Sequence, residues 1–135
     1  MVQQPCQLFV ALAEEGWTDS PATRAVAEHY LAPLFSGPSA PDTLVLGCTH
    51  FPVLADTIRK IIGSNVSLVD SGETTALAVA DALASGSLGS TSKANGGAAR
   101  IFATDSPERF ARVGAVFLGW PIDAEAVELV DLRVL

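Results

Sequence analysis

The feature that most constrains the fold is a short apolar segment, Thr43 to Gly47, which has strand-forming residues and no alternation of apolar and polar positions. A strand that is buried on both faces has this pattern, because neither face meets water. The segment 53–62 follows, with valine, leucine and isoleucine at helical spacing, and Gly63 closes it. A buried strand that leads into an amphipathic helix is typical of a parallel α/β sheet.

The alternation of strands and helices continues along the rest of the chain. Segment 7–16 is predicted to be either a strand or a turn of helix that leads into a loop. Asp19 or Ser20 caps a helix that has Pro21 in its first turn. The later expected elements are a strand at 66–70, a loop at 71–73, a helix at 74–84, a strand at 100–104, a helix that begins at 106–108 with Asp105 or Ser106 as its cap, and a strand at 127–132. This order predicts an α/β fold with a mostly parallel sheet.

The size and charge of the chain narrow its class. At 135 residues, 49% of them hydrophobic, it matches one ordinary soluble domain, with a Gly/Ser-rich flexible linker expected at about 85–98. Asp and Glu number 15 against 8 Lys and Arg, which gives a net charge of −7 without a basic cluster. We therefore expect no nucleic-acid partner and no membrane partner. No apolar run reaches the roughly 18 residues of a membrane span, so a cytoplasmic location is expected.

The tripeptide Cys48-Thr49-His50 stands at the end of the first buried strand, where parallel sheets bind ligands. Gly47 would let the backbone approach a ligand, and amides at the following helix N-terminus would suit a carboxylate. A thiol beside an imidazole could act as a base or a nucleophile. The alternative is that Cys48 is a small core residue. A metal site is not expected, because no second ligand pair lies at zinc-like spacing.

The segment from Leu46 to Pro52, Leu-Gly-Cys-Thr-His-Phe-Pro, resembles the second catalytic-cysteine motif of the glutamate racemases, in the aspartate/glutamate racemase superfamily. The segments 5–16, 68–74 and 102–128 are also similar to this family, so the resemblance covers nearly the whole chain. It implies a three-layer α/β domain with a parallel sheet. It also implies a racemase without a cofactor, in which two facing cysteines exchange the α-proton of glutamate and supply D-glutamate for peptidoglycan.

The resemblance also implies roles for individual residues. Cys48 would be the second acid–base cysteine and His50 its assisting imidazole, while Thr49 and Gly47 would contact the substrate. Glu14 matches a family acid that is thought to assist at the active site. The adjacent Glu15 is the alternative in register, and for either residue the competing interpretation is a carboxylate that simply faces water.

The family also has an earlier half, which supplies the first catalytic cysteine within a Cys-Asn-Thr motif, and that motif does not occur here. Cys6 reads as a packing residue, so the chain resembles the C-terminal half of a racemase and is predicted to be inactive alone. Residues 1–73 would form part of the second domain, and residues 74–135 would complete the first.

The missing half leads to a further expectation. The apolar side chains Phe102, Phe110, Val116 and Phe117 would be exposed, which favours a homodimer. Two other functions remain open: a non-catalytic fragment that binds an amino acid or has a regulatory role, and a racemase of the aspartate type.

Overall fold

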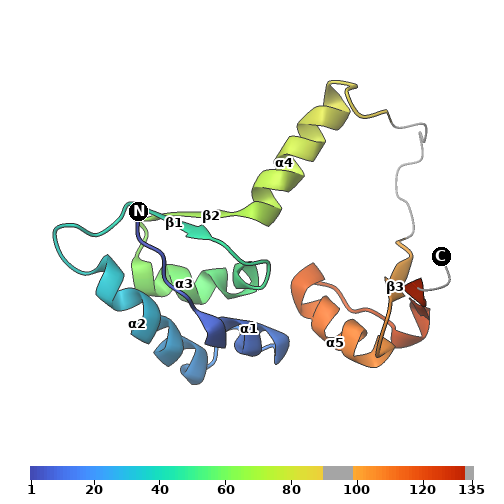
Figure 1. Ribbon diagram of the computed structural model, residues 1–135, viewed down its shortest axis with the longest axis horizontal. Coiled ribbons are helices and arrows are strands. Elements are labelled where there is room, and N and C mark those ends of the chain that lie inside the picture. Colours follow the sequence, from blue (N-terminus) through green and yellow to red (C-terminus); the bar gives the residue numbers. More distant parts are fainter. Residues whose placement is uncertain (90–98, 133–135) are drawn as a thin grey trace. The chain divides into compact units, whose positions relative to one another are not determined.

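The computed structural model describes residues 1–89 and 99–132, which divide into two compact units, Met1–Ser90 and Thr91–Leu135 (Figure 1). The chain has the α/β fold expected from the sequence, with helices between short parallel strands. None of the helices in the described part of the chain is long and apolar enough to cross a membrane. Part of the expected linker at 85–98, residues 90–98, lies outside the described residues.

The first unit opens with two helices. Segment 7–16, predicted to be either a strand or a turn of helix, contains helix α1, Gln7–Glu14, which buries Phe9 and Ala13. Helix α2, Pro21–Phe35, begins as predicted: the Ser20 hydroxyl accepts a hydrogen bond from the Thr23 amide at 3.1 Å, and Pro21 lies in the first turn. A capping hydroxyl and a proline stabilise a helix start because the first amides have no partner within the helix.

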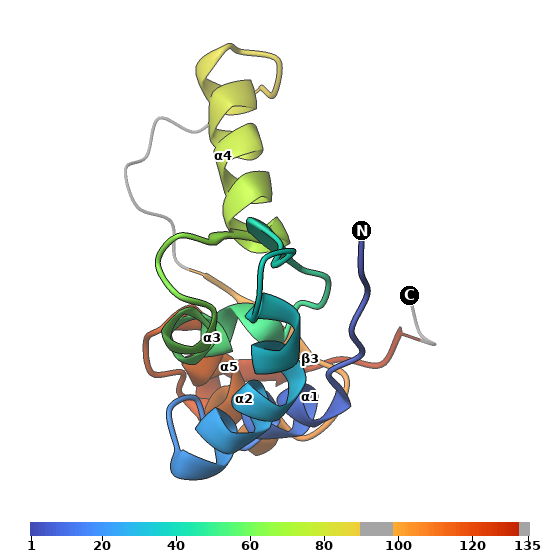
Figure 2. The same cartoon turned by 90° about the vertical axis from the view of Figure 1, so that its left-hand side faces the viewer.

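Strands β1, Thr43–Leu46, and β2, Ser67–Asp70, pair in parallel, with Thr43 opposite Ser67 and Leu46 opposite Asp70. The predicted burial of β1 on both faces is wrong: Leu46 is 4% exposed, but Val45 is 65% exposed. The physical reason is visible in Figures 1 and 2, where α1, α2 and α3 all lie on the same side of the strand pair. Successive side chains of a strand point to opposite faces, so covering one face buries only every second residue.

The connection from β1 to β2 contains a turn of 3-10 helix, η1, Phe51–Leu54, and helix α3, Ala55–Ile62. Gly63 ends α3 with a φ of 86°, a left-handed conformation that favours glycine. The buried core of this unit centres on Phe9, Leu54 and Ile58, each no more than 2% exposed. Two edge-to-face ring contacts place Phe9 between Tyr30 of α2 and Phe51 of η1.

Asp19, in the loop before α2, is the centre of a polar cluster that joins α2 to α3. Its carboxylate accepts hydrogen bonds from Arg24 and Lys60, both at 2.9 Å, and from the hydroxyl of the buried Thr57 at 3.2 Å. The hydrogen bonds from Arg24 and Lys60 hold the pKa of Asp19 well below its usual range. The single proton of the Thr57 hydroxyl is shared between Asp19 and the closer Thr18 carbonyl at 2.8 Å, which keeps this buried polar group satisfied.

Helix α4, Ser71–Ala84, begins three residues earlier than predicted, so the expected loop at 71–73 is wrong. Asp70 explains the difference, because its carboxylate caps the helix by accepting from the Glu73 amide at 2.8 Å. Helix α4 buries none of its residues, and Leu77 and Leu83 are 62% and 48% exposed.

In the second unit, strand β3, Ile101–Ala103, pairs in parallel with β4, Val127–Leu129, and helix α5, Pro107–Leu118, packs against them. A 3-10 turn, η2, spans Ala124–Ala126. Strand β4 is shorter than predicted. Ser106 is at the N-cap position of α5, but its side chain makes no capping hydrogen bond.

The expected exposure of apolar side chains in this unit is present: Phe102, Phe110 and Phe117 are 47%, 38% and 37% exposed, and Val116 is half-buried. Helix α5 contacts the small core of this unit through the buried Ala111, which packs with Ala103 and Val127. The sheet of this unit has two strands in the described residues, which offer little surface for covering larger side chains.

Candidate active site

The candidate site begins where β1 ends. Gly47 leaves the strand, and Cys48, Thr49 and His50 form a turn that is closed by a hydrogen bond from the Phe51 amide to the Cys48 carbonyl at 3.2 Å. The turn leads into η1, so the first turn of α3 does not directly follow Cys48. The helix start that follows the thiol is therefore that of η1, and the expected binding of a carboxylate by its amides remains a prediction.

Three side chains of this region form a continuous chain of polar contacts. His50 Nε2 lies 2.9 Å from Glu14 Oε1, and His50 Nδ1 lies 3.8 Å from Cys48 Sγ. Glu14 and His50 are about equally half-buried, with side chains 29% and 28% exposed. A carboxylate that binds one imidazole nitrogen fixes the orientation of the ring, and here that orientation turns the other nitrogen toward the thiol.

Packing of apolar residues explains how Glu14 reaches a histidine 36 positions away in the sequence. The rings of Phe9 and Phe51 meet edge to face with centroids 5.4 Å apart, which attaches η1 to α1. Glu14 ends α1, and His50 immediately precedes η1. Fixing the two elements against each other therefore brings the carboxylate to the imidazole.

The adjacent residues Glu14 and Glu15 have different surroundings in the structure. Glu14 contacts His50, while Glu15 is exposed and follows the last residue of α1. Of the two residues that could match the family acid, Glu14 and Glu15, the geometry favours Glu14. Its role in chemistry remains a prediction.

Thr49 and Gly47 adjoin Cys48, and both are exposed. A side-chain carbon built on Gly47 would meet no atom within 4 Å. Within the described residues, neither packing nor backbone conformation requires a glycine at this position. The predicted contacts of these two residues with a substrate remain predictions.

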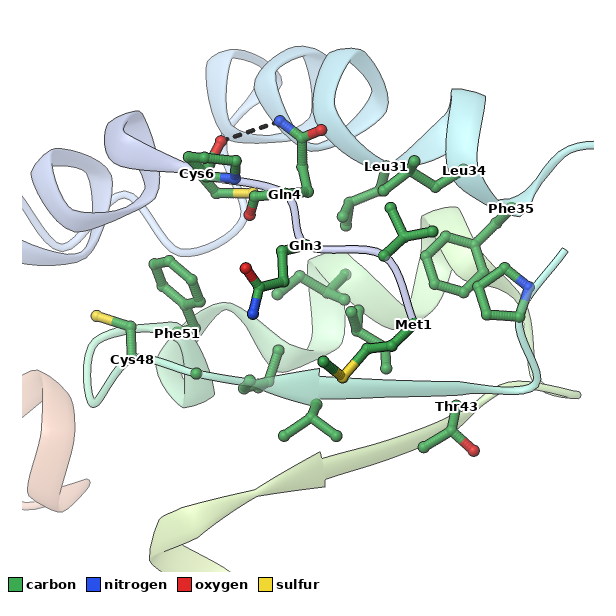
Figure 3. Close-up of a pocket in the computed structure, with 18 of the residues that line it drawn as sticks. Met1, Gln3, Gln4, Cys6, Leu31, Leu34, Phe35, Thr43, Cys48 and Phe51 are labelled. Carbon is green, nitrogen blue, oxygen red and sulfur yellow. Dashed lines mark hydrogen bonds between the residues drawn. The ribbon is translucent and has the colours of Figure 1, made fainter.

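A cavity of about 770 Å³ lies along β1, between this strand, the end of α2 and the N-terminal residues (Figure 3). Cys48 stands at one end of the cavity, next to Phe51, whereas Glu14, Thr49 and His50 do not line it. No lining side chain is charged. The cavity is not predicted from the sequence, although the apolar residues near the end of α2 are a signal for it.

The second cysteine of the chain has a different environment. Cys6 is 7% exposed and packs in the core, and its thiol donates a weak hydrogen bond to the Gln4 carbonyl at 3.5 Å. Burial raises the pKa of the Cys6 thiol, which disfavours the thiolate. Both cysteines are free. The position of Cys6 agrees with its interpretation as a packing residue.

The described residues include no group of three or more His, Cys, Asp or Glu side chains that could hold a metal ion. The arrangement is instead that of a thiol, an imidazole and an orienting carboxylate. Such a set can move protons to and from a substrate, and it can also activate the sulfur as a nucleophile.

Comparison with known proteins reveals clear relatives. A scan against models of protein families finds no match. Among curated proteins, the chain is 42% identical to a glutamate racemase of Koribacter versatilis over 93% of this chain and 50% of the relative. It is 46% identical to a glutamate racemase of Geobacter metallireducens over 88% of this chain and 43% of the relative. The chain thus spans about half the length of these curated relatives.

Solved structures agree with the sequence matches. The glutamate racemase of Thermus thermophilus, in complex with β-chloro-D-alanine, has a TM-score of 0.79 and 37% identity over 98% of this chain and 48% of that one. The glutamate racemase of Francisella tularensis, in complex with D-glutamate, has a TM-score of 0.76 and 32% identity over 98% of this chain and 47% of that one.

Proposed function

We propose that this chain, which is related by sequence and fold to about half of a glutamate racemase, supplies one of the two acid–base thiols of such an enzyme. The thiol is that of Cys48, with His50 as the imidazole that exchanges its proton. Glu14 orients His50. The observation that carries the proposal is the contact chain from Glu14 through His50 to Cys48.

The chemistry follows from this chain of contacts. The α-proton of an amino acid is very weakly acidic, so its removal needs a base held in position and donors that stabilise the developing charge. His50 Nδ1 can take the thiol proton, and the Cys48 thiolate can then remove the α-proton of glutamate from one face. In the reverse direction the thiol returns a proton to that same face. No cofactor takes part in these steps.

Inversion also needs a proton donor on the opposite face of the substrate. Cys6 is unsuited to this role, since it is buried in the core and its thiol is bonded to the Gln4 carbonyl. The second thiol of the proposed enzyme therefore comes from the half that this chain does not match, and the chain alone does not racemise glutamate.

Glutamate is the proposed substrate because the relatives are glutamate racemases, and the enzyme of Francisella tularensis was solved with D-glutamate. Thr49 and Gly47 are the proposed substrate contacts, because both are exposed beside Cys48. The proposed role of the whole enzyme is to supply D-glutamate for peptidoglycan in the cytoplasm.

The test joins this chain to the part of the Thermus thermophilus enzyme that it does not match. Exchange and inversion of the α-proton are followed in heavy water by proton NMR and by chiral chromatography of glutamate. We expect the joined protein to interconvert L- and D-glutamate, and we expect Cys48→Ala to abolish this. The chain alone should show no interconversion.

The control is circular dichroism of each protein, which shows whether it is folded. A folded joined protein that exchanges no α-proton would contradict the proposal. Sustained racemisation by the 135-residue chain alone would contradict the claim that a second thiol comes from elsewhere.

A further inference from the structure

The contact chain at Cys48 has a second chemical capability, which needs no opposing thiol. A thiol, an imidazole and a carboxylate in this order also form the machinery of acyl transfer, in which the imidazole withdraws the thiol proton and the third group orients the ring. Here the distances are 3.8 Å from Cys48 Sγ to His50 Nδ1 and 2.9 Å from His50 Nε2 to Glu14 Oε1. Proton transfer and nucleophilic attack therefore start from the same geometry.

Acyl transfer also requires a donor for the negative charge that forms on the carbonyl oxygen. In hydrolases this donor is commonly the backbone amide of the residue that follows the nucleophile. Thr49 follows Cys48 and is exposed. Its backbone amide donates no hydrogen bond to any acceptor within residues 1–89 and 99–132. A hydrogen-bond donor is thus available next to the sulfur.

The cavity along β1 indicates which acyl groups fit. Cys48 and Phe51 lie at one end of this volume of about 770 Å³, and Leu44 and Leu46 are among its lining residues (Figure 3). Because no lining side chain is charged, an uncharged hydrocarbon chain is accommodated better than an anionic one. In Figure 3 the sulfur of Cys48 points away from the other labelled residues, so the reacting carbonyl would lie just outside this end of the cavity.

We propose that this chain has an acyl-transfer activity in which Cys48, activated by His50, accepts an uncharged acyl group from an activated ester. The sulfur attacks the carbonyl carbon, a C–S bond forms and the C–O bond breaks. The proton that left the thiol for His50 passes to the departing oxygen. His50 then takes a proton from water, the hydroxide attacks the thioester, the C–S bond breaks and the sulfur recovers the proton.

This activity is independent of racemisation, because it uses neither glutamate nor a second thiol. It is tested on the 135-residue chain alone. The chain is treated with p-nitrophenyl acetate and p-nitrophenyl butyrate, release of p-nitrophenolate is followed by absorbance, and peptide mass spectrometry locates the acyl group. Rates are divided by those of glutathione, which corrects for the different reactivities of the two esters.

We expect acylation of Cys48 at least about 10-fold faster than that of glutathione or Cys6, and a larger ratio for butyrate than for acetate. Loss of a general base typically lowers rates by about 10²-fold or more, so His50→Asn should remove the advantage over glutathione.

Glu14 is tested as a positioning residue with its neighbour as the matched control. Glu14→Gln should slow acylation about 10-fold, less than the loss at a fully buried triad, because this carboxylate is part-exposed. Glu14→Asp should restore part of the rate, whereas Glu15→Gln removes the same charge and should change nothing.

Acylation of Cys48 no faster than that of glutathione would overturn the proposal. So would a rate that survives both His50→Asn and Glu14→Gln. Equal ratios for the two esters would refute the part assigned to the cavity.

Discussion

Phe9 connects the core of the first unit to the candidate site, and its replacement tests this connection. In Phe9→Leu the position stays apolar, but both edge-to-face contacts are lost, to Tyr30 at 5.5 Å and to Phe51 at 5.4 Å between centroids. Such contacts contribute about 0.5–1.5 kcal/mol each beyond burial. We therefore expect the free energy of unfolding of this unit to fall by about 1–3 kcal/mol.

The matched control is Leu8→Ala, which removes a larger part of its side chain at the adjacent position. Leu8 is 53% exposed, whereas Phe9 is 2% exposed. Surface substitutions usually change stability by about 0.5 kcal/mol or less. The control should therefore be nearly neutral, although it deletes more apolar volume than Phe9→Leu.

Urea unfolding measures both variants. Trp17 lies in the first unit and Trp120 in the second, so a Trp120→Phe background makes Trp17 fluorescence specific for the first unit. Equal losses in the two variants, or a loss below about 0.5 kcal/mol in Phe9→Leu, would refute the assigned packing role. Because Phe9 holds η1 against α1, the joined racemase should also lose activity in Phe9→Leu even where the protein stays folded.

Three further predictions concern charge and backbone. Hydrogen bonds from Arg24 and Lys60 lower the pKa of Asp19 in the folded protein. The Asp19 carboxylate therefore contributes fully to stability above its unfolded pKa of about 3.9, and this contribution is lost as the pH falls toward the folded pKa. The difference in urea midpoint between wild type and Asp19→Asn should shrink from pH 7 to pH 3. Gly63→Ala should destabilise the first unit by about 1 kcal/mol, because φ is 86° there. Gly47→Ala should leave stability unchanged, since its side chain meets open space, but should raise the KM for glutamate in the joined racemase. A Gly63→Ala protein as stable as wild type, or an unchanged KM in Gly47→Ala, would contradict these assignments.

Local signals in the sequence were sufficient for several elements. Ser20 and Pro21 marked the start of α2, and Gly63 marked the end of α3, because caps and left-handed turns depend on a few adjacent residues. The start of α4 differs from the prediction because Asp70 has two roles: it ends β2, and its side chain also caps the helix.

The burial of β1 could not be predicted from its own residues. An apolar strand has the same composition whether one face or both are covered, and the outcome depends on what packs against it. In this chain helices cover one side, so Val45 remains exposed. The exposed apolar residues of α4 and of the second unit agree with the finding that the chain spans only about half of its relatives.

Residue type and local spacing are sufficient to predict the α/β class, the position of Cys48 at the end of a strand and the resemblance to the glutamate racemases. The contact of His50 with Glu14 instead of Glu15, by contrast, depends on how the helices pack. Two adjacent carboxylates are nearly equivalent in a sequence, but on a helix they point in different directions. Packing of Phe9 against Phe51 then determined which direction faces the imidazole.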